Sequence, residues 1–120
     1  MLYLDFDYSE DEQGFGTLEA MAATRPDQVV AVHREIQQVL DWAHRTFPGM
    51  RAPLDEGGEW DFHLQGQQEW AAAEEIHYDA ESRALHVQLG SRGPARHTVT
   101  LSLTGTPQFC DAFRQQFLQD

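Results

Sequence analysis

Residues 74–89, EEIHYDAESRALHVQL, predict a β-hairpin that turns at residues 80–83. Pairing Asp79 with Ala84 sets the register, which places Tyr78 opposite Leu85, His77 opposite His86 and Ile76 opposite Val87. In this register the apolar residues of both strands share one face, and the histidines share the other. A hairpin connection favours an antiparallel sheet over a parallel one.

Three other stretches alternate apolar and polar residues with the period of a half-buried strand. They are LYLDFDY at residues 2–8, EWDFHLQ at 59–65 and HTVTLSLTG at 97–105. In the first stretch, Asp5 and Asp7 are expected to face outward. Residues 17–24, TLEAMAAT, have helical propensity, but their place after a Gly-containing turn favours a strand that pairs with the first one.

Two helices are predicted from apolar residues at helical spacing. The longer one covers residues 26–47, where Thr24 is expected to cap the start and Pro48 and Gly49 to end the helix. In the shorter one, Thr106 caps the start and Pro107 takes the first position. Its apolar stripe consists of Phe109, Ala112, Phe113 and Phe117.

The predicted order of elements is therefore β-β-α-β-β-β-β-α within a single domain, residues 1–120. Hairpin-like connections and two amphipathic helices predict an α+β two-layer sandwich. Its sheet is mainly antiparallel, with the long helix and the C-terminal helix on one face. The other face of the sheet would be open to water.

The composition excludes several chemistries. The chain has no Lys and no Asn, so all eight basic residues are Arg; this suggests a GC-rich bacterial gene and excludes a Schiff base, a P-loop lysine and a lysine general base. Cys110 is the only cysteine, which excludes an internal disulfide and a Cys-x-x-Cys site. Packing is its expected role, and we expect no cofactor.

No stretch of the sequence predicts a membrane span or a signal peptide. The apolar runs are only a few residues long, whereas a transmembrane helix needs about 20. Acidic residues occupy the N-terminal region, where a signal peptide would be basic and then apolar. We therefore expect a cytoplasmic protein whose chain begins at Met1.

The acidic residues are clustered along the chain. The net charge is -12, and 15 of the 20 acids lie in two Arg-free segments, residues 1–24 and 52–82. Binding to nucleic acid or to an anionic membrane needs clustered positive charge and is not expected. A basic protein surface is the natural complement of such a chain.

Residues 5–16, DFDYSEDEQGFG, space oxygen-bearing side chains as a calcium loop would. An EF-hand loop that begins at Asp5 requires Gly at its sixth position and Glu at its twelfth. The chain has Glu10 and Gly16 at these positions, and the preceding residues alternate as a strand. A solvated strand followed by an acidic turn is the preferred interpretation.

Three histidines, His63, His77 and His86, fall on the polar sides of predicted strands. Imidazoles on neighbouring strands, with carboxylates nearby, can hold zinc or another divalent metal. His77 and His86 are predicted neighbours, but His63 joins them only if its strand pairs directly with residues 74–79. Polar residues on a solvated sheet face are the simpler interpretation.

The sequence thus predicts a non-enzymatic protein-binding module that uses an acidic, open sheet face. The candidate binding residues are Asp5, Asp7, Asp61, Glu75, Asp79 and the tryptophan Trp70, which lies in the polar stretch GQQEWAAAEE. Two alternatives remain. One is a metal-binding protein or metal-dependent enzyme that uses the strand histidines, and the other is a structural subunit of a homo-oligomer.

Overall fold

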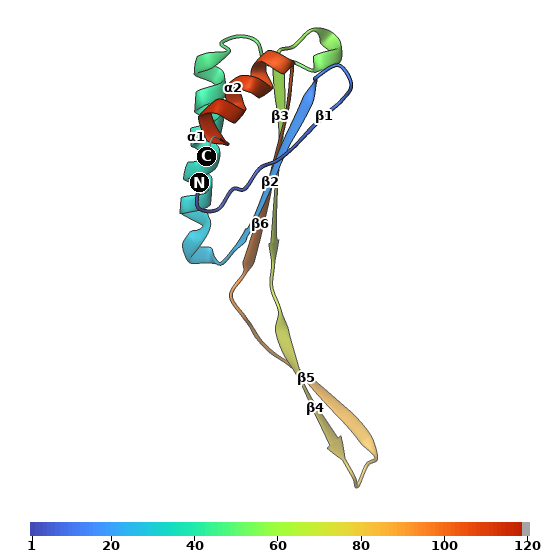
Figure 1. Cartoon of the computed structure of the whole chain (residues 1–120). Helices are drawn as coiled ribbons and strands as arrows, with labels where there is room; N and C mark the ends of the chain where they lie inside the picture. Colours follow the sequence, from blue (N-terminus) through green and yellow to red (C-terminus); the bar gives the residue numbers. More distant parts are fainter. Residues whose placement is uncertain (119–120) are drawn as a thin grey trace.

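Figure 1 shows the computed structural model of the chain, which describes residues 1–118. Within these residues, two helices and six strands form a body and a long projecting hairpin. The elements are β1 (Asp7–Glu10), β2 (Gly16–Thr24), α1 (Val29–Thr46), β3 (Trp60–Glu69), β4 (Ala72–Asp79), β5 (Ala84–Arg92), β6 (Arg96–Gly105) and α2 (Pro107–Phe117). Short 3-10 turns, Pro26–Gln28 and Leu54–Glu56, precede α1 and β3. The predicted α+β class and antiparallel pairing are confirmed.

The body contains a four-stranded sheet in the order β1-β2-β6-β3, with every neighbouring pair antiparallel. The strand β6 is central, and it pairs with β2 on one side and β3 on the other. In the middle of the sheet, Leu103 lies opposite Leu18 of β2 and opposite Phe62 of β3. The strand predicted over residues 17–24 is confirmed as β2.

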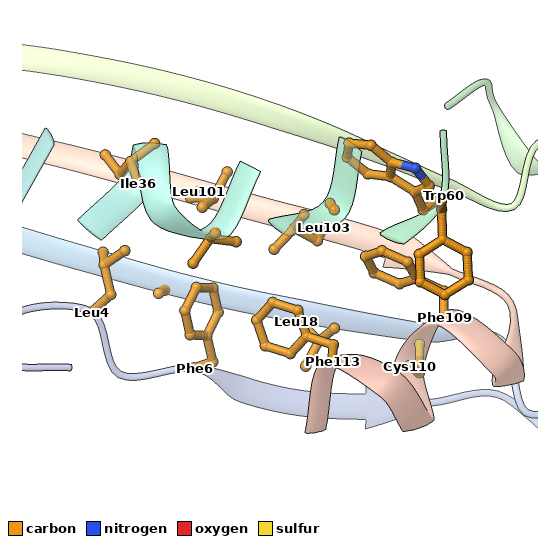
Figure 2. Packing of buried hydrophobic residues seen from close by; sticks show 14 of the residues in the cluster. Leu4, Phe6, Leu18, Ile36, Trp60, Leu101, Leu103, Phe109, Cys110 and Phe113 are labelled. Atoms are coloured by element: carbon orange, nitrogen blue, oxygen red, sulfur yellow. The ribbon is translucent and has the colours of Figure 1, made fainter. Parts of the chain in front are cut away.

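Both helices pack on one face of this sheet (Figure 1), where the alternating apolar residues of the strands point. Figure 2 shows the buried core between these layers, which includes Leu18, Trp60, Leu101 and Phe113. The indole of Trp60 stacks on the ring of Phe109 with centroids 5.6 Å apart and an interplanar angle of 4°. Burial of large apolar side chains is the main stabilising contribution to such a core.

The C-terminal helix begins as predicted. Thr106 is the N-cap of α2, its hydroxyl accepts a hydrogen bond from the N–H of Phe109 at 3.3 Å, and Pro107 takes the first position. The start of the long helix differs from the prediction. Thr24 is the buried last residue of β2 and not a cap, since a 3-10 turn intervenes and α1 begins at Val29.

The first strand is shorter than the predicted residues 2–8, although Leu4 and Phe6 are buried as the alternation requires. The carboxylate of Glu35 in α1 accepts hydrogen bonds from the N–H groups of Leu2, Tyr3 and Leu4, at 2.9–3.2 Å. These groups therefore bind a helix side chain instead of a neighbouring strand.

The hairpin predicted from residues 74–89 forms, and its register is the predicted one. It is a separate two-stranded sheet made of β4 and β5, and it projects away from the helices (Figure 1). We call residues 72–92 the arm and the rest of the fold the body. The arm makes the molecule elongated, with principal extents of 73 × 28 × 27 Å.

Candidate functional site

The arm is held by its own strand pairing and by a tight turn at its tip. The side chain of Asp79 accepts a hydrogen bond from the N–H of Glu81 at 3.0 Å. This bond, and a second one with the side chain of Ser82, hold the pKa of Asp79 below its usual range. Arg83 completes the turn with a positive φ of 55°, a conformation that few non-glycine residues adopt.

One face of the arm carries a row of large apolar side chains, which we call the apolar row. Its members are Ile76, Tyr78, Leu85, Val87 and Leu89, each between 57% and 69% exposed. None of the residues from 61 to 94 is buried. The arm is therefore a β-hairpin with an apolar face that the body does not cover.

Alternation alone predicts this face as apolar, but not that it is exposed. In β6 the same alternation buries Leu101 and Leu103 under the helices. The arm lies beyond the helices, so its equivalent residues meet solvent. No local signal in the sequence distinguishes the two cases, because both read as period-two strands.

The opposite face of the arm is polar. His77 lies directly opposite His86, and Glu75 lies opposite Gln88. The Nε2 atom of His86 is 4.0 Å from a carboxylate oxygen of Asp79. Around these residues lies an open hollow of about 490 Å³ lined by Glu75, His77, His86, Val87 and Gln88.

The three candidate histidines do not come together. His63 lies in β3, which pairs with β6, and its direct neighbour is Ser102. The strand of His63 would have to pair with residues 74–79 for His63 to become a third ligand, and this condition is not met. Within residues 1–118, no group of three or more His, Cys, Asp or Glu side chains is arranged to hold a metal ion.

The five candidate acids are distributed over three parts of the molecule. Asp7 lies in β1 and Asp61 in β3, which are the two edge strands of the body sheet; Asp5 is exposed just before β1. Glu75 and Asp79 lie in the arm. The five acids therefore do not share one open sheet face, contrary to the prediction, because the arm is a sheet separate from that of the body.

Two of these acids have different surroundings on the body. Asp7 is exposed and lies directly opposite Glu19 of β2, so two like charges are cross-strand neighbours on the face away from the helices. Asp61 instead forms an ion pair with Arg51, with Nε and Oδ1 2.9 Å apart, and accepts the N–H of Phe62. Its charge is thus balanced within the chain.

The acidic stretch at residues 5–16 is strand β1 followed by a turn. One carboxylate oxygen of Asp11 accepts the N–H groups of Gln13 and Phe15, at 2.9 and 3.0 Å. Gly14 has a φ of 87°, which glycine adopts readily. Asp11 therefore stabilises the turn, as the interpretation of a strand and acidic turn expects.

Trp70 lies at the base of the arm and is 51% exposed. The guanidinium of Arg92 lies over its ring, 5.3 Å from the ring centroid, which is a cation–π contact. The predicted role of Trp70 in partner contact stays a prediction.

Cys110 is fully buried in α2, as its predicted packing role requires. Burial raises the pKa of its thiol, so the reactive thiolate is disfavoured at neutral pH.

Tyr8, a neighbour of Cys110, donates a hydrogen bond to Glu10 at 2.8 Å. Burial and this bond raise the pKa of Tyr8 to about 12.

Comparison with protein-family models, with curated proteins and with solved structures finds no match for this chain. Neither helix of the described residues has the length and apolar character that a membrane span requires. The surfaces described above therefore carry the argument about function.

Proposed function

We propose that this chain is a non-enzymatic protein-binding module whose main binding element is the arm. The observation that carries the proposal is the apolar row, five large side chains aligned on a projecting hairpin without cover from the body. Contiguous exposed apolar surface of this kind marks sites of protein interaction in folded proteins. The edges of β4 and β5 add unpaired backbone groups that a partner strand can meet.

The stability of hairpins supports the same proposal. An isolated two-stranded hairpin is only marginally stable in water, and a cover over its apolar face stabilises it. A binding partner supplies such a cover. The polar face of the arm, with His77 and His86, stays in contact with water.

A non-enzymatic role is supported by the placement of the reactive side chains. The thiol of Cys110 is buried with a raised pKa. His63 is in a different sheet from His77 and His86. A cytoplasmic, bacterial origin belongs to the same proposal, and it is supported by the single cysteine and the absence of Lys and Asn.

A capture experiment tests the role of the arm. A tagged chain and its Ile76→Ser, Val87→Ser double variant are used to retain proteins from a bacterial lysate. The matched control is Val30→Ser, which changes a side chain that is 60% exposed on α1. The lysate also contains the untagged chain, so that a second copy can be captured. We expect the wild type and the control to retain proteins, with this chain counted among them, that the arm variant loses; identical sets of proteins would contradict the proposal.

A second candidate surface is the open face of the body sheet, with a basic protein as its partner. The observation that favours it is the cross-strand pair of Asp7 and Glu19. Like charges directly opposite one another destabilise a sheet, and neither carboxylate forms an ion pair within residues 1–118. A basic partner surface would offset this repulsion.

Charge reversal distinguishes binding by this face from a general effect of the net charge on solubility. Glu19→Arg places a cation opposite Asp7, so the fold should be slightly stabilised while the association rate with a basic partner falls. The control Glu56→Arg makes the same charge change at an exposed site in the loop before β3. If both variants alter association equally, net charge alone is responsible and the open face is not a binding surface.

A further inference from the structure

The five residues of the apolar row occupy three cross-strand levels along the arm. Tyr78 and Leu85 form the level at the tip, Ile76 and Val87 the middle level, and Glu74 and Leu89 the level nearest the body. Partner residues in an antiparallel pair lie on the same face of the sheet. Apart from the apolar atoms, these three levels present two polar groups, the Tyr78 hydroxyl at one end and the Glu74 carboxylate at the other. Arg92, opposite Ala72, lies beyond them at the base of the arm.

We propose that the arm binds the arm of a second copy of this chain, with the two apolar rows face to face and the arms antiparallel. This inference rests on the proposed protein-binding role of the arm and names its partner. A two-fold axis passes near the middle level, where Ile76 and Val87 of the two copies meet. Contacts of this kind are self-complementary and close into a dimer.

The ends of the row favour the antiparallel arrangement. It places the Tyr78 hydroxyl of each copy over the Glu74 carboxylate of the other, where the hydroxyl can donate a hydrogen bond to the carboxylate. A parallel arrangement would instead place both Glu74 carboxylates at the same end of the apolar contact, each over Leu89 of the other copy. Like charges in such surroundings repel strongly.

The charge of the body favours the same arrangement. The chain has a net charge of -12, so two bodies side by side would repel one another. Antiparallel arms hold the bodies at opposite ends of the contact, separated by about the length of an eight-residue strand, roughly 26 Å. That separation exceeds the Debye length of about 8 Å at physiological ionic strength, so the repulsion is screened.

The available area is sufficient for a specific dimer. Taking about 150–200 Å² for a fully exposed large side chain, the row presents roughly 500 Å² in each copy. Two rows in contact bury roughly 1,000 Å², at the lower end of specific interfaces. The dimer is therefore expected to dissociate on dilution.

The charges of the arm also favour a second copy over a basic protein at this face. Glu74 is the only charged residue at the three levels of the row. The acids Glu75 and Asp79 lie on the opposite face with the histidines. A strongly basic surface would thus meet apolar side chains and lose the hydration of its own charges.

Sedimentation equilibrium of the purified chain tests the proposal across a concentration series that extends above 100 µM. The expected mass at high concentration is twice 13.7 kDa. Val87→Arg places two cations near the two-fold axis and should weaken dimerisation at least tenfold. The control Gln88→Arg makes the same charge change on the opposite face of the same strand and should dimerise as the wild type does.

A distance measurement tests the orientation. Cys110 is buried and is the only cysteine, so a spin label on Ser82→Cys in a Cys110→Ala background reports on the arm tips alone. Antiparallel arms place the two labels roughly 26 Å apart. Adjacent labels would overturn the antiparallel arrangement.

The remaining outcomes are also decisive. A chain that stays monomeric throughout the series, or a dimer that Val87→Arg does not weaken, overturns the proposal of a second copy. If the chain is monomeric but the arm variant still loses captured proteins, the partner is a different protein and the proposed function stands. Circular dichroism of each variant confirms that the fold is retained.

Discussion

Gly105, the last residue of β6, lies so close to Phe109 that a Cβ atom at position 105 would overlap the aromatic ring. Phe109 is fully buried and stacks on Trp60, so its ring has little room to move. We expect Gly105→Ala to lower the free energy of unfolding by about 1–3 kcal/mol. Urea denaturation measures this change.

Gly66 in β3 provides the control for that substitution. A Cβ atom there meets no other atom within 4 Å, and the residue is exposed. Gly66→Ala is expected to leave the stability unchanged or to raise it by about 0.5 kcal/mol, because alanine reduces the freedom of the unfolded chain. Equal destabilisation by both substitutions would show that Phe109 does not restrict position 105.

Glu35 holds the N-terminal segment against α1 through the N–H groups of residues 2–4. Hydrogen bonds to a charged acceptor contribute about 1.5–3 kcal/mol, so we expect Glu35→Ala to destabilise the fold by an amount in that range. Hydrogen exchange at residues 2–4 should accelerate as well. Gln37→Ala, an exposed change in the same helix, should alter neither measurement.

Tyr8 predicts a loss of stability at alkaline pH. Its folded-state pKa is raised from 10.0 to about 12, so between these values the unfolded chain releases a proton that the folded chain retains. The free energy of unfolding therefore decreases as the pH rises from 10 to 12. Tyr8→Phe should make this decrease less steep without abolishing it, because the pKa of Cys110 is raised as well. Urea titrations at several pH values measure the decrease. If its slope is the same in Tyr8→Phe, the loss of stability does not come from Tyr8.

His77 and His86 predict weak zinc binding. They are cross-strand neighbours, but two imidazoles fill only half of the four positions that zinc usually takes in proteins. We expect calorimetric titration to give a dissociation constant in the micromolar range or above, and this constant should increase further in His77→Ala. Submicromolar binding that both His77→Ala and His86→Ala abolish would instead indicate a metal site.

The sequence predicts local structure here better than it predicts where the elements lie. The hairpin register could be read from residues 74–89 because a shift of one residue would mix the apolar and polar faces. The cap at Thr106 could be read from the Thr-Pro pair that begins α2. Both features depend on neighbours in the chain.

The features that the sequence did not predict depend on contacts between residues that are far apart in the chain. Glu35 and the N–H of Leu4 are 31 positions apart, and no local pattern shows that a helix carboxylate binds this segment. Arg51 and Asp61 likewise pair across a loop. The position of the arm is decided by how far the helices reach, so period-two alternation could not separate its exposed strands from the buried ones of the body.

The central position of β6 has a consequence for synthesis of the chain on the ribosome. β2 and β3 are both made earlier, but each pairs with β6 and not with the other. Until residue 105 has emerged, the nascent chain holds only the β1–β2 and β4–β5 hairpins, and the apolar side chains of β3 have no neighbouring strand in the body sheet. The body is therefore expected to form late and in one cooperative step, when β6 pairs with the unpaired edges of β2 and β3.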